Sequence, residues 1–243
     1  MKNWNGKRYW LVGAGDGLGA ALATRLSTAG AHVIVSSRSE DKLKALVDAL
    51  PSDGSYQTVD VADDQSVKAA AEAVGPVDGV VFLAGVYWPF PAQEWNAGQA
   101  TAMADINFTG LMRVMGAVVP GMVRRDAGHI VITGSLSGFR GLPGSIGYTA
   151  SKAGTMSLAE CMYADLRQTG VQVQVANPGF IKTQLTDKND FKMPFLMTPE
   201  EAAEHMFKHM NSDRFKLSFP RLFSLVFRGS QLLPDWLYFR IFS

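Results

Sequence analysis

The stretch GAGDGLG, residues 13–19, decides the fold of this chain. It follows a short apolar run at 9–12 and opens into the Ala- and Leu-rich segment 20–26. Strand, glycine turn and helix in this order predict a turn that bends sharply and lets a pyrophosphate come close to the backbone. The start of the helix offers free N–H groups and the positive end of its dipole to that phosphate. An ordinary tight turn is the alternative interpretation, and the motif alone does not separate the two.

Short apolar runs alternate with helical patterns along the chain, which is typical of buried parallel strands joined by helices. We expect strands at 9–12, 32–36, 55–58, 77–83, 129–133 and 171–176, and helices at 17–29, 40–49, 65–74, 98–125, 147–169 and 199–210. The alternation favours a parallel sheet covered on both faces. The sequence therefore predicts a Rossmann-like, doubly wound α/β fold in three layers, with residues 1–243 forming one domain.

Composition narrows the class of function. Lys and Arg number 23 and Asp and Glu 22, so the net charge of +1 gives no electrostatic reason to expect nucleic acid. Cys161 is the single cysteine, which excludes an internal disulfide and suits a reducing cytoplasm. Its helical neighbourhood predicts a small buried hydrophobe rather than a nucleophile. No stretch approaches the roughly 20 apolar residues of a membrane span, so we expect a cytoplasmic protein.

Ligands of an open parallel sheet bind outside the carboxyl ends of its strands, so the residues there are candidate site residues. The second strand ends in Ser36-Ser37-Arg38, without the acidic residue that would bind a ribose 2′-hydroxyl. The Arg38 guanidinium matches the geometry of a phosphate, which predicts NADP(H) in preference to NAD(H). A solvated loop charge is the alternative for Arg38. Asp16, inside the glycine turn, does not favour a phosphate.

Tyr148 and Lys152 are four residues apart in an expected helix and so lie on one face of it. A lysine charge about 4 Å from a phenol, at an effective dielectric of ~20, interacts by about 4 kcal/mol and lowers the pKa of the phenol. Such a tyrosine can exchange a proton as a carbonyl and an alcohol interconvert. Ser135 ends the fifth strand, where its hydroxyl can hold the substrate oxygen. Asn107 is a poor residue for a helix interior and predicts either a local kink that holds a water or a surface position.

These motifs resemble the short-chain dehydrogenase/reductase family, of the single-domain type with a Tyr-x-x-x-Lys motif, over roughly residues 5 to 210. The resemblance implies an NAD(P)-dependent enzyme acting on CH–OH donors, with Tyr148 as acid/base and Ser135 orienting the carbonyl. It implies that Lys152 binds the nicotinamide ribose and lowers the pKa of Tyr148, and that Asn107 holds a water in the proton relay. The cofactor-binding residues it implies, with those from the turn and rim, are Gly13, Asp16, Gly17, Leu18, Gly19, Ser37, Arg38, Asp60, Val61, Ala84, Gly85, Tyr148, Lys152, Pro178, Gly179, Ile181 and Thr183. Two departures are Val12 in place of a threonine and Phe82-Leu83 in place of the Asn-Asn of an Asn-Asn-Ala-Gly motif.

Apolar side chains on the same rim predict a pocket for a hydrophobic ketone or aldehyde. They are Tyr87, Trp88, Phe90, Phe139, Phe180, Phe191, Met193 and Phe195. Residues 184–197 are expected to form a lid over this pocket. His205 and His209 are one turn apart, but the metal-ligand pattern is incomplete and we expect no metal.

Residues 217–243 form an apolar C-terminal extension with a narrow polar stripe. A buried subunit interface or packing within the chain is one interpretation, and a peripheral membrane helix is the other.

The sequence thus predicts an NADP(H)-dependent oxidoreductase that reduces a hydrophobic ketone or aldehyde, or oxidises the alcohol, by hydride transfer. We expect a homodimer or homotetramer with a small-molecule substrate. Two alternatives stay open. One is an NADP(H)-binding sensor or scaffold with little turnover, and the other is a membrane-associated, lipid-modifying reductase.

Overall fold

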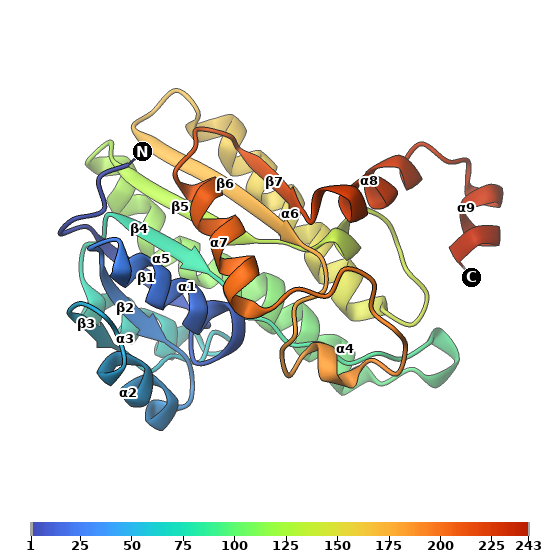
Figure 1. The fold of residues 1–243 in the computed structure, drawn as a ribbon, viewed down its shortest axis with the longest axis horizontal. Helices are drawn as coiled ribbons and strands as arrows, with labels where there is room; N and C mark the ends of the chain where they lie inside the picture. Colours follow the sequence, from blue (N-terminus) through green and yellow to red (C-terminus); the bar gives the residue numbers. More distant parts are fainter. Residues whose placement is uncertain (1, 243) are drawn as a thin grey trace.

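Seven parallel strands form the central sheet of the computed structural model, which describes residues 2–242 (Figure 1). Their order is β3-β2-β1-β4-β5-β6-β7, and every neighbouring pair is parallel. The strands are β1 (Arg8–Val12), β2 (His32–Ser36), β3 (Gly54–Tyr56), β4 (Gly79–Phe82), β5 (Gly128–Thr133), β6 (Val171–Pro178) and β7 (Lys216–Phe219). The chain direction across the sheet reverses between β1 and β4, and such a switch point is where ligands bind in doubly wound sheets.

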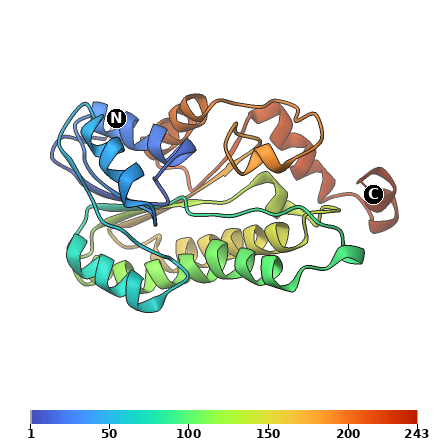
Figure 2. The ribbon, with the colours of Figure 1, turned by 90° about the horizontal axis from the view of Figure 1, so that it is seen from below.

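Helices cover both faces of the sheet, and the predicted doubly wound α/β fold is confirmed (Figure 2). One layer holds α1 (Gly17–Thr28), α2 (Glu40–Asp48) and α7 (Pro199–Met210). The other holds α3 (Asp64–Val74), α4 (Ala97–Ala104), α5 (Gly110–Arg124) and α6 (Ile146–Leu166). Two hydrophobic cores therefore form, one on each side of the sheet.

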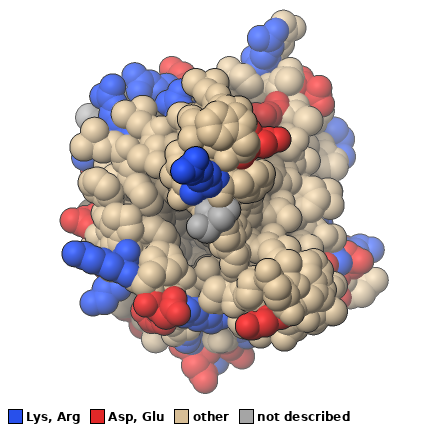
Figure 3. All heavy atoms as spheres, turned by 90° about the vertical axis from the view of Figure 1, so that its right-hand side faces the viewer, with Lys and Arg blue, Asp and Glu red and all other residues tan. Residues whose placement is uncertain are grey.

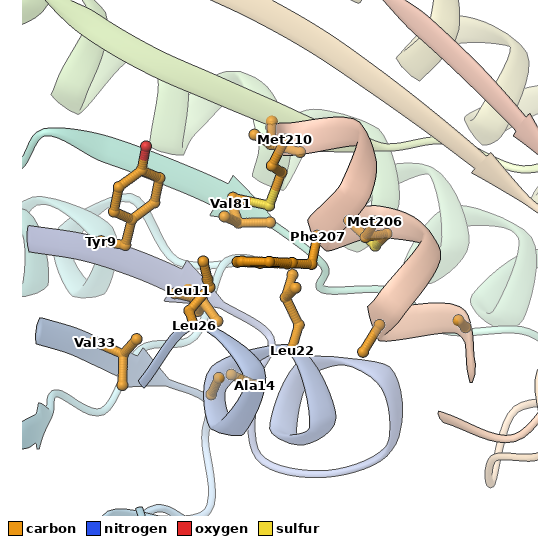
Figure 4. Close-up of a cluster of buried hydrophobic side chains, with 14 of the residues drawn as sticks. Tyr9, Leu11, Ala14, Leu22, Leu26, Val33, Val81, Met206, Phe207 and Met210 are labelled. Atoms are coloured by element: carbon orange, nitrogen blue, oxygen red, sulfur yellow. The ribbon is translucent and has the colours of Figure 1, made fainter. Parts of the chain in front are cut away.

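The alternation of side chains along β1 explains why the strands appear in the sequence as continuous apolar runs. Tyr9 and Leu11 point into the core under α1 and α7, whereas Trp10 and Val12 point into the core under α3 and α5. Figure 4 shows the first core, in which Leu22 of α1 packs beside Phe207 of α7. Because both faces are buried, no position of β1 after its first residue is free to be polar.

The helix expected at 98–125 is interrupted. A π-helical turn, Asp105–Thr109, separates α4 from α5, and Asn107 at its centre is fully buried. A wide turn of this kind is common at functional sites. The predicted kink at Asn107 is therefore present, and the surface alternative for this residue is wrong.

The run Ala97–Arg124 is the one helix within residues 2–242 long and apolar enough, by length and composition alone, to cross a membrane. This differs from the expectation that no stretch is long enough. A helix packed in a protein core passes the same test, and Met103, Leu111 and Val114 of this run are fully buried against neighbouring elements.

The C-terminal region differs from the expected boundaries. The predicted extension 217–243 starts inside the sheet, because Lys216–Phe219 form β7 and pair with β6. Helices α8 (Arg221–Ser230) and α9 (Asp235–Phe242) follow and reach beyond the edge of the sheet (Figure 1). A strand of four residues with one charged and one polar side chain carries too little periodicity to be predicted.

The environment of Cys161 also differs from the prediction. Its side chain is exposed on α6, not buried as expected. Cys161 lies two positions after the fully buried Ala159, and at about 100° per residue this places it on the outer side of the helix.

Candidate active site

A cleft of about 590 Å³ opens at the carboxyl ends of the strands. Every residue predicted to bind the cofactor lines it, and so does Ser135. Segments following six different strands contribute to its walls, which is why residues far apart in the sequence meet there.

The glycine turn forms one wall of this cleft and needs its glycines. Gly13 adopts a φ of +95°, and a Cβ there would stand 2.3 Å from the backbone nitrogen of Ala84. A Cβ on Gly19 would stand 2.5 Å from the carbonyl oxygen of Gly13. The turn therefore packs directly against the end of β4 and against α1, as a dinucleotide-binding turn requires.

The start of α1 faces the same cleft. Its N-cap residue, Asp16, makes no side-chain hydrogen bond to the first turn of α1, and its carboxylate instead pairs with Lys42 Nζ at 2.7 Å. The first N–H groups of α1 therefore stay available to an anion. Gly17 has a φ of +52°, and a Cβ there would meet Thr183 at 2.9 Å, so the segment after β6 closes over the turn.

Basic and hydroxyl groups surround the end of β2. Ser37, Arg38 and Lys42 all line the cleft there, and both basic side chains are exposed. Arg38 was predicted from the sequence as a site residue, whereas Lys42 was not. The sequence feature that could have indicated Lys42 is its position four residues after Arg38, in the first turn of an expected helix.

Tyr148 and Lys152 lie on one face of α6, as their spacing predicts. Lys152 is only 4% exposed and donates a hydrogen bond from Nζ to the carbonyl oxygen of Thr133 at 2.9 Å. The Nζ atom lies 5.8 Å from the centre of the Tyr148 ring. Burial without a neighbouring carboxylate lowers the pKa of Lys152 to about 8.

The pKa of Tyr148 moves opposite to the expectation. Burial raises it, and a hydrogen bond with the Ser135 side chain only partly offsets that rise. Lys152 is not among the groups that shift this pKa, and removal of the phenol from water outweighs the hydrogen bond with Ser135. Tyr148 is therefore a neutral phenol at pH 7, which can donate a proton.

Ser135 follows β5, and its hydroxyl faces two neighbours. Ser135 Oγ lies 2.9 Å from Ser137 Oγ and accepts a hydrogen bond from the backbone N–H of Ser137 at 3.2 Å. These contacts hold the hydroxyl in place at the edge of the cleft beside Tyr148.

Asn107 lies behind the cleft wall. Its Nδ2 donates to the carbonyl oxygen of Val86 and to Ser151 Oγ, both at 3.0 Å, and its Oδ1 accepts from Val86 N at 2.7 Å. The side chain thus ties the segment after β4 to α6. A Cβ on Gly85 would stand 3.4 Å from Asn107 Oδ1 and 3.9 Å from Lys152 Nζ, so both groups lie beside Gly85.

Comparison with known proteins agrees with this arrangement. A family model described as short chain dehydrogenase matches residues 7–193. An uncharacterized oxidoreductase of Myxococcus xanthus is 36% identical over 94% of this chain and 93% of its own length. One from Staphylococcus epidermidis is 30% identical over 74% of this chain and 80% of its own. The chain belongs to the short-chain dehydrogenase family.

Solved structures place this short-chain dehydrogenase among oxidoreductases. The crystal structure of gox2181 superposes with a TM-score of 0.80 at 27% identity, covering 88% of this chain and 95% of that one. Actinorhodin polyketide ketoreductase with NADPH also gives 0.80 at 25% identity, covering 90% and 97%. The protein is accordingly an oxidoreductase acting on CH–OH groups, and its family binds NAD(P)H.

The cleft of this short-chain dehydrogenase fits a dinucleotide. The glycine cradle leaves room where side chains would intrude, and the start of α1 has no side-chain cap from Asp16. The buried ammonium of Lys152 makes one hydrogen bond to Thr133, which leaves N–H donors for a ribose hydroxyl.

The structure brings only part of the predicted apolar set to the cleft. Trp88 lines the cleft, and the Tyr87 ring stands edge-on to Tyr148 with centroids 5.0 Å apart. Phe90 is buried, in a β-bridge with Ser145, and does not line the cleft. The other predicted apolar residues do not line the cleft and are half-buried or exposed: Phe139, Phe180, Phe191, Met193 and Phe195.

The expected lid, 184–197, contacts the opposite wall through Lys188. Lys188 Nζ donates to the carbonyl oxygen of Tyr87 at 2.7 Å and lies 4.5 Å from the centre of the Trp88 ring. Lys188 was not predicted as a site residue, because a lone lysine in an expected loop has no distinguishing signal in the sequence.

His205 and His209 lie on α7, away from the cleft lining. The exposed His205 ring stacks on Phe219, whereas His209 is 3% exposed. Within residues 2–242 no three His, Cys, Asp or Glu side chains are grouped to hold a metal ion.

Proposed function

We propose that this enzyme uses NADPH to reduce a hydrophobic ketone or aldehyde. One cleft contains the Tyr148 phenol, the Ser135 hydroxyl and the buried Lys152 ammonium, together with a glycine turn that fits a pyrophosphate. This observation carries the proposal. When bound, the nicotinamide supplies the hydride. The chain's own residues then hold the carbonyl and provide the proton.

In this proposal Ser135 donates a hydrogen bond to the substrate oxygen, and Tyr148 transfers its proton to that oxygen. The raised pKa keeps Tyr148 protonated at neutral pH, so that the phenol can donate a proton to the carbonyl oxygen. Lys152 holds the nicotinamide ribose hydroxyls with the donors that Thr133 does not use. Asn107 connects the segment after β4 to the start of α6 through its hydrogen bonds. We also propose that Asn107 orders a water in the proton relay.

The preference for NADPH rests on the end of β2. Arg38 and Lys42 supply two cations, and Ser37 a hydroxyl, around the position expected for the adenosine ribose. A 2′-phosphate there gains from both cations, and Lys42 also offsets the Asp16 carboxylate. Asp60 and Val61 would flank the adenine, and Gly179, Ile181 and Thr183 the nicotinamide.

Two further expectations belong to this proposal. We place the enzyme in a reducing compartment such as the cytoplasm, where the exposed thiol of Cys161 stays reduced. We also propose a homo-oligomer, since Met112 and Val123 of α5 are apolar and more than 40% exposed.

Tyr148→Phe tests the proposed chemistry. We expect kcat for carbonyl reduction to fall by about 10²-fold or more, because the proton donor is lost. The NADPH dissociation constant, measured by fluorescence titration, should change little. A variant that keeps its turnover would contradict the role of Tyr148 and favour an NADP(H)-binding sensor or scaffold with no need of this phenol.

A further inference from the structure

Exposed apolar side chains gather at the C-terminal end of the molecule. Seven of them on α8, α9 and the turn between are 51% to 88% exposed: Leu222, Leu225, Val226, Leu232, Trp236, Phe239 and Ile241. We call these residues the C-terminal apolar surface. Figure 3 shows this end of the molecule as mostly uncharged, with many of its charged groups toward the edges. Soluble monomers rarely expose a contiguous apolar patch of this kind without a binding role.

Helix α8 carries apolar residues on both sides. Phe223 turns inward and stacks with Phe195, their centroids 5.6 Å apart. The outward side carries Leu222, Leu225 and Val226, which are three and four residues apart and so share a face. An apolar face turned to solvent is unexplained by the packing of this chain.

Arginines border that outward face. Arg221 and Arg228 are seven residues apart on α8, both exposed, and at helical spacing they line one edge of it. Arg240 is exposed on α9. An apolar face with a basic edge and a neighbouring tryptophan is the pattern of a helix that lies in a membrane interface.

Arg140 holds this surface in place from the loop after β5. Its guanidinium donates to the carbonyl oxygens of Ser230 at 2.7 Å and Leu233 at 2.8 Å. It also pairs with Asp235 and lies 3.9 Å from the centre of the Tyr238 ring. The surface is therefore preformed, and the carboxylate of α9 is already neutralised.

The surface continues into the substrate end of the cleft. Gly179 lines the cleft, and a Cβ there would stand 3.1 Å from Phe223 of α8. The Phe180 ring packs at a tilt against Phe223 and edge-on against Phe191 of the lid, at 5.7 Å and 5.8 Å between centroids. Phe191 and Phe195 are more than half exposed. A continuous cluster of packed aromatic side chains thus connects the cleft wall to the outer surface.

We propose that the C-terminal apolar surface docks on an anionic lipid bilayer and that the carbonyl substrate enters from that bilayer between α8 and the lid 184–197. The entry step rests on the proposed function, whereas the docking step does not. Substrates of this class would be aldehydes or ketones with a long acyl or prenyl-like chain, which partition into membranes.

Charge favours a bilayer over a second copy of the chain as the occupant. A twofold interface buries the same patch of both partners, so one contact would gather Arg221, Arg228 and Arg240 from each copy. In the described part of α8 and α9, Asp235 is the acidic residue available, and Arg140 already engages it. Anionic headgroups supply the missing countercharges.

The docking step is tested by co-sedimentation of the full chain with vesicles, without cofactor or substrate. We expect binding to phosphatidylcholine vesicles that contain phosphatidylserine, and much weaker binding to phosphatidylcholine alone. The double variant Leu222→Asp, Val226→Asp should stay in the supernatant, while the matched Leu222→Met, Val226→Ile variant binds. Arg221→Glu with Arg228→Glu should weaken binding about 20-fold or more, and Arg221→Lys with Arg228→Lys should not.

Light scattering without vesicles decides between lipid and a second copy. If the Asp variant forms a smaller assembly than wild type while vesicle binding is unaffected, a second copy covers the surface and the proposal is overturned. Wild-type protein that ignores phosphatidylserine vesicles overturns it as well.

The entry step is tested with two substrates. The Leu222→Asp, Val226→Asp variant should reduce a short, water-soluble aldehyde at the wild-type rate but a vesicle-embedded long-chain aldehyde at least tenfold more slowly. Equal rates on the embedded aldehyde overturn the entry step. If wild type reduces no carbonyl at all while still binding vesicles, the proposed function fails and docking stands.

Discussion

At the scale of single residues, the site depends on two groups whose pKa values burial shifts in opposite directions. Burial keeps the Tyr148 phenol protonated and lowers the pKa of Lys152 to about 8. Spacing in the sequence brought these two residues to one helix face. Their pKa values depend on how much water the surrounding loops exclude, and a four-residue spacing carries no information about that.

The stability of the fold should report the burial of Lys152. The unfolded lysine has a pKa near 10.5 and the folded one about 8, so the unfolded state binds more protons between these values. The free energy of unfolding of wild type relative to Lys152→Met should therefore rise by about 3 kcal/mol from pH 8 to pH 10.5. Urea titrations at several pH values measure this difference. Lys68→Met, at an exposed lysine, serves as the control. If the difference in unfolding free energy between wild type and Lys152→Met does not change with pH, the folded lysine is not desolvated.

Arg38 and Lys42 should determine which dinucleotide is preferred. Arg38→Asp places a carboxylate where a 2′-phosphate would lie and an acceptor where a 2′-hydroxyl would lie. We expect the ratio of kcat/KM for NADPH to that for NADH to fall by about 10²-fold or more. Lys42→Met should lower the ratio less, because Arg38 remains. An unchanged ratio in Arg38→Asp is the result that excludes NADP(H) specificity at the end of β2.

At the scale of elements, helices and strands with strong periodicity were predicted, and irregular ones were not. The π turn at Asp105–Thr109 depends on hydrogen bonds from Asn107 to Val86 and Ser151, which are distant in sequence. β7 exists because α7 returns the chain to the open edge of β6. Both features need partners that a local pattern does not contain.

The lid segment offers a test at this scale. Lys188→Met keeps the length of the side chain but removes the hydrogen bond to Tyr87 and the charge over Trp88. We expect KM for a hydrophobic carbonyl to rise about fivefold, as one hydrogen bond of about 1 kcal/mol is lost. Lys192→Met, exposed on the same segment, should leave KM unchanged. Equal KM values for wild type and Lys188→Met would mean that this contact does not close the lid.

At the scale of the whole molecule, two cores on opposite faces of one sheet hold the cleft open at its edge. Leu22 of α1 is fully buried among residues of β1, β4 and α7, whereas Leu222 of α8 is 69% exposed. Leu22→Ala should lower the free energy of unfolding by 2–5 kcal/mol, roughly the range for buried leucines. Leu222→Ala should change it by about 0.5 kcal/mol or less. Denaturant titration compares the two, and equal losses would contradict the placement of Leu222 on the surface.

The sequence by itself determined the layered α/β fold, the glycine turn and the position of Tyr148, Lys152 and Ser135 at one rim. Those features follow from local backbone geometry and from the rule that parallel strands end at a common edge. Only the tertiary structure decided the exposure of Cys161, the place of Lys42 and Lys188 on the cleft wall, and the docking of α8 and α9 by Arg140. These depend on which distant segments exclude water from a side chain or supply its hydrogen-bond partner, and such contacts form only when the whole chain has folded.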